Sequence, residues 1–116
     1  MAGLMLGKVL KPDQSGRPQL LTVDVEESGL RLCFSRLPKA AVISQEGAFV
    51  MLLAVVPAVE QGGTLQLSSG QEASWHLKAR SDGMQLGVIG LQSVQGRWLK
   101  EADGSPCIRI RIQPSG

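Results

Sequence analysis

The feature of this sequence that most constrains its fold is a strictly alternating stretch near the end of the chain. Three isoleucines alternate there with a cysteine and two arginines, in the order Cys107, Ile108, Arg109, Ile110, Arg111 and Ile112. Successive side chains of a β-strand point to opposite faces of a sheet, so this stretch has one apolar face and one polar, basic face. An Asp103-Gly104 turn signal separates it from residues 94–100, and the two segments together predict a β-hairpin.

The clearest further hairpin lies near the start of the chain. Residues 21–26 and 30–36 alternate between apolar and polar side chains, and a Glu-Ser-Gly turn signal lies between them. Leu21, Val23 and Val25 are expected to face the core, while the polar residues between them face water.

Another hairpin is predicted in the second half, where residues 75–80 and 84–88 alternate on either side of a Ser-Asp-Gly turn signal. The apolar run 48–59 predicts a buried strand or two strand pieces, because it is rich in valine and Pro57 would break a helix. The middle apolar positions of the alternating segments are predicted core residues, namely Val23, Leu32, Leu77 and Ile110.

Three other segments have weaker patterns. Residues 4–10 predict a first strand. Residues 64–67 predict a short strand that follows a turn at the glycine pair 62–63. Residues 38–45 fit either one short helix or a short strand.

Short strands separated by turn signals, without any long helical period, indicate an all-β fold. We expect a small barrel, similar to an OB fold, or a sandwich of five to seven short antiparallel strands, with a short helix at 38–45 as the alternative to a strand there. Fourteen glycines suit the sharp bends of a small sheet. The length of 116 residues is enough for one core, so residues 1–116 are expected to form a single domain.

The two cysteines, Cys33 and Cys107, lie far apart in the sequence, with no CxxC motif and no neighbouring histidine. A zinc site is therefore not expected. We expect two free thiols in a reducing compartment and a cytoplasmic location, because the chain does not open with the charged and apolar segments of a secretory signal. A disulfide between the two cysteines is the alternative that the sequence leaves open.

Residues suited to catalysis are scarce. The single histidine, His76, is expected on the solvent side of its strand, and no GxSxG motif is present to expose a nucleophile. Asp82 and Asp103 precede glycines, as turn-forming aspartates do. No glycine-rich segment leads into a helix that could hold a phosphate. We therefore expect a non-catalytic protein without a metal or another cofactor.

Binding is the function class that remains. The chain has twelve basic and ten acidic residues, a surplus too small to indicate nucleic acid or an anionic membrane by itself. Its longest apolar run is shorter than the roughly 20 residues of a membrane span, so no membrane partner is expected. Arg97, Arg109 and Arg111 are expected to share one outer face, which Lys78 and Arg80 would extend if the two C-terminal hairpins lay side by side. With Lys100, the candidate ligand-binding residues are Lys78, Arg80, Arg97, Lys100, Arg109 and Arg111.

A basic outer face accompanied by tryptophans is typical of proteins that bind single-stranded nucleic acid, which is the ligand we expect first. Residues 94–113 place a Gly-Arg-Trp strand and an Asp-Gly turn before an alternating last strand. This arrangement resembles the closing hairpin of OB-fold single-strand-binding proteins, although such a hairpin identifies no family.

Two observations favour a different partner. Aromatic residues make up only 3% of the chain, and Trp75 and Trp98 are both expected to turn toward the core. Arginines on a terminal strand also protect a sheet edge from unwanted pairing. The alternative function is a protein-interaction or assembly module that uses an exposed strand edge, for example as a homodimer.

Overall fold

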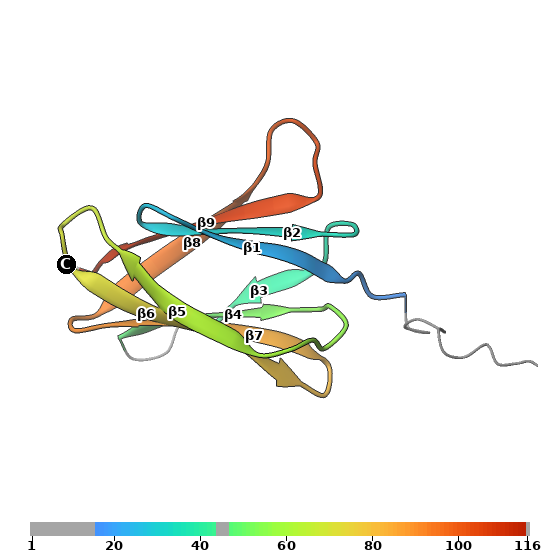
Figure 1. Cartoon of the computed structure of the whole chain (residues 1–116), viewed down its shortest axis with the longest axis horizontal. Coiled ribbons are helices and arrows are strands. Elements are labelled where there is room, and N and C mark those ends of the chain that lie inside the picture. The colour runs from blue at the N-terminus through green and yellow to red at the C-terminus, as the bar shows by residue number, and fades with distance from the viewer. Residues whose placement is uncertain (1–15, 44–46, 116) are drawn as a thin grey trace, which may run out of the picture.

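A computed structural model describes residues 16–43 and 47–115 of the chain. These residues form nine strands and no helix (Figure 1). In chain order the strands are β1 (Leu20–Glu26), β2 (Gly29–Phe34), β3 (Ala40–Val42), β4 (Ala48–Leu53), β5 (Gln61–Gln66), β6 (Glu72–Arg80), β7 (Gly83–Gly90), β8 (Val94–Lys100) and β9 (Cys107–Pro114). The strand expected at 4–10 lies outside the described residues.

The strands form two antiparallel sheets that stack face to face (Figure 1). Sheet A has four strands in the order β1-β2-β9-β8, and sheet B has five in the order β3-β4-β7-β6-β5. The predicted all-β class is confirmed, and of the two expected architectures the protein adopts the sandwich. The described residues hold nine strands rather than five to seven.

All three predicted hairpins form, and their apolar faces meet between the sheets. Leu32, Leu77 and Ile110 are each 0% exposed, as their central positions in the alternating segments predict. Val23 is half-buried and packs against the same core. Because both sheets contribute side chains to one cluster, neither sheet has a separate core.

The expected inward positions of β1 are partly wrong. The register of β1 against β2 shifts between Leu20 and Thr22, which marks a β-bulge. A bulge adds one residue to a strand and changes which side chains point inward, and Leu21 is accordingly 59% exposed. Val25 pairs with the buried Leu30 but is itself 51% exposed, because β1 is an edge strand with no neighbour on its other side.

Two of the less distinct segments also differ from expectation. Residues 40–42 form strand β3, so the short helix is wrong there, and residues 44–46 lie outside the described residues. The glycine pair 62–63 forms no turn but lies within β5. Gly63 is paired with Trp75, and a Cβ added at Gly63 would lie 3.3 Å from the indole nitrogen. The glycine therefore leaves room for the tryptophan ring on the core face.

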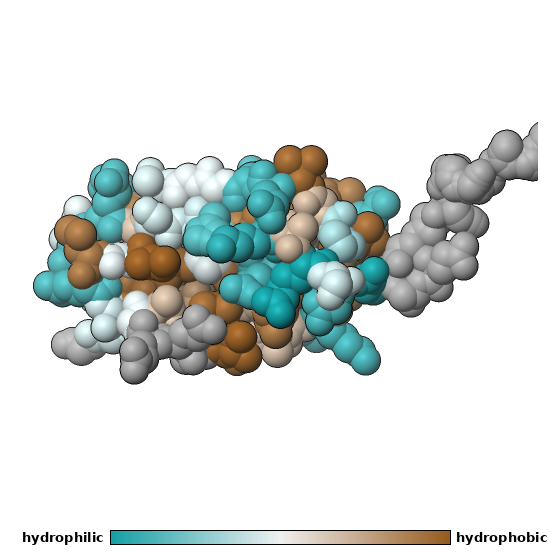
Figure 2. Space-filling model, turned by 90° about the horizontal axis from the view of Figure 1, so that it is seen from below, coloured by the Kyte–Doolittle hydropathy of each residue, from teal (hydrophilic) through white to brown (hydrophobic). Residues whose placement is uncertain are grey.

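The outer face of sheet B carries few charges near its centre. Val50 of β4, Gly87 of β7 and His76 of β6 lie in one row across the strands, and Val50 is only 4% exposed. Ile89 lies on the same face and is 53% exposed. Figure 2 shows the molecule from the side of sheet B, where hydrophobic and hydrophilic surface are intermixed.

Candidate functional site on the arginine face

The outer face of sheet A, called here the arginine face, holds four arginines from three adjacent strands. Arg31 of β2 is paired with Arg109 of β9, and Arg111 of β9 is paired with Arg97 of β8. The isoleucines that alternate with the β9 arginines are buried, so the arginines point away from the core. The structure thus brings Arg97, Arg109 and Arg111 together on one face.

The other predicted basic residues are divided between the two sheets. The two C-terminal hairpins do not lie side by side, because β6 and β7 belong to sheet B whereas β8 and β9 belong to sheet A. Lys78 and Arg80 of β6 therefore do not extend the arginine face, and Arg80 instead forms an ion pair with Asp82. Lys100 ends β8 and lines the same hollow as Arg97 and Arg109.

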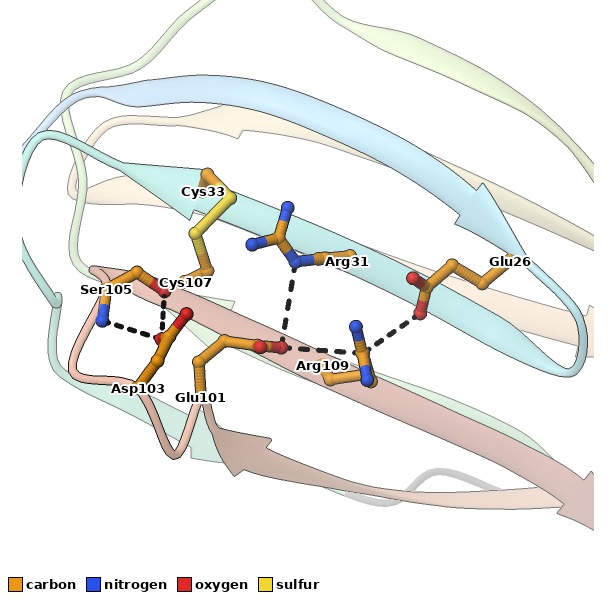
Figure 3. The surroundings of a disulfide bond; sticks show 8 residues. All are labelled: Glu26, Arg31, Cys33, Glu101, Asp103, Ser105, Cys107 and Arg109. Carbon is orange, nitrogen blue, oxygen red and sulfur yellow. Dashed lines mark hydrogen bonds and ion pairs between the residues drawn. A yellow bond between two sulfur atoms is a disulfide. The ribbon is translucent and has the colours of Figure 1, made fainter.

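Two of the four arginines are neutralised by acidic residues that sequence reasoning did not connect to them. Glu101, which follows β8, has its Oε2 atom 3.6 Å from Nε of Arg31 and 3.4 Å from Nε of Arg109 (Figure 3). Glu26 of β1 lies 3.2 Å from the same nitrogen of Arg109. The Glu101 side chain is only 16% exposed, so water screens these ion pairs less than it would at an open surface.

The other two arginines, Arg97 and Arg111, have no counter-ion among the described residues. Both are exposed, and neither forms an ion pair or a hydrogen bond with another described residue. Glu26 shares their row across the sheet, but Gly29 lies between Glu26 and Arg111 and has no side chain. Like charges directly opposite each other on a sheet repel, so this pair is a place where an anion would relieve repulsion.

Two surface hollows border the uncompensated pair, and both are lined by Arg97 and Arg111. One has a volume of about 360 Å³ and lies against the turn between β1 and β2, where Ser28 lines it. The other has a volume of about 400 Å³ and lies beside the neutralised half, where Arg109 and Glu101 line it. None of the described residues that line the first hollow is acidic.

The expectation of two free thiols is wrong, because Cys33 and Cys107 form a disulfide on this face (Figure 3). Strands β2 and β9 are neighbours, and their register places the two cysteines directly opposite each other with the Cα atoms 4.0 Å apart. Separation along the chain did not prevent contact in the sheet. Disulfides persist mainly in oxidising compartments, and the cytoplasmic location, which was expected from the start of the sequence, stays a prediction.

The loop that carries Glu101 is organised by Asp103. Its Oδ1 atom accepts hydrogen bonds from the backbone nitrogen of Ser105 at 2.9 Å and from the Ser105 hydroxyl at 2.7 Å. These hydrogen bonds favour the ionised carboxylate and lower the pKa of Asp103 below its usual value. The predicted turn signal at Asp103-Gly104 is therefore part of the framework of the site, and Gly104 adopts a positive φ of 81°.

The chain's aromatic side chains are all turned inward. Phe34 and Phe49 are each 1% exposed and Trp75 is 6% exposed. Trp98 is half-buried and packs against the core from β8. The arginine face therefore lacks an aromatic surface on which a base could stack.

The two edges of sheet A differ in charge. The β1 edge carries Asp24 and Glu26 on the arginine face, and the β8 edge carries Arg97 there, with Lys100 at its end. Within the described part of the chain, no backbone hydrogen bond outside the sheet ladders reaches residues 22–26 of β1 or 95–99 of β8. Both strands thus present unpaired backbone groups along one side.

Neither a metal site nor a membrane-spanning helix is found in residues 16–43 and 47–115. No group of three or more His, Cys, Asp or Glu side chains in these ranges could hold a metal ion. The same residues include no helix suited to crossing a bilayer.

Comparison with known proteins returns no match. No protein-family model matches the chain, and neither a curated protein nor a solved structure matches it.

Proposed function

We propose that this protein is a non-catalytic assembly module whose copies join edge to edge through sheet A. The observation that carries the proposal is the opposite charge of the two edges, acidic at β1 and basic at β8. An exposed strand edge binds another strand through backbone hydrogen bonds, and the side chains beside it select the partner. Here the β8 edge of one copy meets the β1 edge of the next.

The strand directions are compatible with this β8–β1 interface, called here the edge joint. Every neighbouring pair in sheet A is antiparallel, and the sheet has an even number of strands, so β1 and β8 run in opposite directions. A second copy translated along the sheet therefore places its β1 antiparallel to β8 of the first. The alternation of strand directions continues across the joint without interruption.

Charge selects this joint over a symmetric dimer. A two-fold axis that paired β8 with β8 would bring the Arg97 side chains of both copies together on one face. A two-fold axis that paired β1 with β1 would do the same with Asp24 and Glu26. Both symmetric pairings oppose like charges, whereas the β8–β1 joint opposes unlike charges. Such a head-to-tail interface leaves one free β1 edge and one free β8 edge on every open oligomer, so further copies can add at either end.

The side chains at the joint match in one register. Glu26 is already paired with Arg109 in its own copy, so Asp24 is the free acidic partner for Arg97. An antiparallel pairing of Arg97 with Asp24 of the second copy places Trp98 opposite Val23 and Gly96 opposite Val25 on the inner side. This arrangement covers Val25, which is 51% exposed in the single chain.

Sedimentation velocity over a range of protein concentrations tests the proposal. We expect wild-type protein to form a series of oligomers that shrinks as salt rises, because the joint depends on exposed charges. The variants Asp24→Lys and Arg97→Glu should each remain monomeric, since each opposes like charges. An equimolar mixture of the two should associate again, because every joint in it opposes unlike charges.

Lys78→Glu, on the outer face of sheet B, is the matched control and should associate like the wild type. Thermal unfolding checks that each variant is folded. A wild-type protein that stays monomeric at all concentrations contradicts the proposal, as does a mixture of the two charge-reversal variants that stays monomeric.

Single-stranded nucleic acid is the second candidate partner, and the uncompensated pair Arg97 and Arg111 favours it. If these arginines and Arg109 contact a phosphate backbone, replacing all three with alanine should lower the salt slope of log affinity by about 0.7 per lost contact. Fluorescence titration with a labelled oligonucleotide at two salt concentrations measures this slope. Absence of oligonucleotide binding by the wild type at low salt excludes this candidate.

A further inference from the structure

We infer that Arg97 and Arg111 form a binding site for a small tetrahedral oxyanion of the phosphate class, in the hollow beside the turn between β1 and β2. The two guanidinium groups lie on directly paired residues of β8 and β9, and no described residue neutralises either of them. The adjacent pair, Arg31 and Arg109, shares Glu101. One arginine pair of this face is thus compensated from within the chain, and the other is open to a ligand.

The wall of the hollow supplies hydrogen-bond donors and no competing acid. Four polar residues line it besides the two arginines, namely Ser28, Ser68, Gln95 and Gln113. Gln95 and Gln113 are themselves a directly paired set, next along β8 and β9 from the arginines. With a volume of about 360 Å³, the hollow has room for a phosphate group and a small substituent. A cationic wall without a carboxylate attracts an anion.

The environment of Ser28, at the edge of the hollow, also indicates a ligand. Its backbone nitrogen donates to the Gln66 carbonyl at 2.8 Å, and its own carbonyl accepts from the Ile112 nitrogen at 2.7 Å. The residue is therefore held in place, with a positive φ of 62°. Its hydroxyl oxygen is buried and has no hydrogen-bond partner in the part of the chain that the structure describes. A buried hydroxyl without a partner costs free energy, and rotation of the Ser28 side chain toward the adjacent hollow would let an anion accept its hydrogen bond.

The chemistry of the two arginines selects the ligand class. A guanidinium group presents a planar fork of N–H donors that matches the oxygens of phosphate, and two such groups match the charge of a phosphate monoester dianion. A single carboxylate would neutralise only one of the two. The site and the edge joint share Arg97 and Gln95 of β8, whereas Ser28, Ser68, Arg111 and Gln113 belong to the hollow and not to the β8 edge.

Isothermal titration calorimetry with inorganic phosphate, and in parallel with glycerol phosphate, tests the site. The titrations use the Asp24→Lys variant, which retains every residue of the hollow but lacks the acidic side chain of the edge joint. Binding is therefore measured without assembly. We expect saturable binding of both probes with one site per chain. Arg97→Gln and Arg111→Gln should each weaken it about tenfold or more, because each removes charge-assisted hydrogen bonds.

Ser28→Gly keeps the turn, since glycine accepts a positive φ, and should weaken binding by a smaller factor than either arginine variant. Lys78→Gln on sheet B is the control and should bind like its parent. The inference is overturned if millimolar phosphate does not bind, or if Lys78→Gln weakens binding as much as Arg111→Gln does. An oligonucleotide that binds while both small probes do not would also overturn it.

Discussion

The two sheets share one core, but their outer faces differ in charge and in cross-linking. Sheet A carries four arginines, the acidic residues that neutralise two of them and a disulfide, whereas the centre of sheet B's outer face is formed by Val50, Gly87 and His76. The inner faces do not differ in this way, because both are lined by buried hydrophobic residues. Stability from the core is thus common to both sheets, while cross-linking and charge recognition belong to sheet A.

The largest expected effects come from the shared core. Leu77→Ala in sheet B and Ile110→Ala in sheet A should each lower the free energy of unfolding by about 2–5 kcal/mol, because both side chains are 0% exposed. Val23→Ala should cost less, since Val23 is half-buried. Urea unfolding measures these losses. A large loss in only one sheet would contradict this expectation, because it would mean that the two sheets do not share one core.

The disulfide should give the next largest effect, and it belongs to sheet A alone. Replacing Cys33 and Cys107 together with alanine should cost about 2–4 kcal/mol, because the cross-link restricts the unfolded chain over a sequence separation of 74 residues. Both cysteines lie on the outer face, so the replacement opens no core cavity. Reductant should lower the Tm of the wild type by about 8 °C or more and leave the double variant unchanged. An unchanged wild-type Tm would contradict this expectation.

The ion pairs of the arginine face should contribute less than the cross-link. Glu101→Gln removes the carboxylate that Arg31 and Arg109 share, so that Arg31 loses its acidic partner and Arg109 keeps Glu26. We expect a loss of about 0.5–1 kcal/mol that shrinks in high salt. Lys78→Gln on sheet B should change stability by no more than about 0.5 kcal/mol. Equal losses of unfolding free energy in the two variants would show that charges on the arginine face stabilise the fold no more than charges on sheet B do.

The smallest effect is expected from Asp103 at the rim of the arginine face. Because hydrogen bonds from Ser105 lower the pKa of Asp103 in the folded state, its ionised form stabilises the fold above the ordinary aspartate pKa of about 4. This contribution should disappear as the pH falls through the lowered pKa. Thermal unfolding between about pH 5 and pH 2 should show a slightly steeper loss of Tm for the wild type than for Asp103→Asn. Identical profiles would contradict the assignment.

The local part of the fold could be read from the sequence. The hairpins β1–β2, β6–β7 and β8–β9 follow from alternation on both sides of a turn signal, and the inward positions of Leu32, Leu77 and Ile110 follow from the same period. These features depend on neighbouring residues of one chain segment. The bulge in β1 and the extension of β5 through two glycines were missed, because each depends on what the opposite strand presents.

Only the tertiary structure decided which hairpins became neighbours. Pairing of β2 with β9 placed Cys33 opposite Cys107 and Arg31 opposite Arg109. Placement of β6 in sheet B separated Lys78 from the arginine face. Alternation determines which side of a strand is apolar, but it does not determine which strand lies next to it. That choice is made when the apolar faces of all the hairpins are buried together, because the free energy of the shared core depends on the whole sheet order.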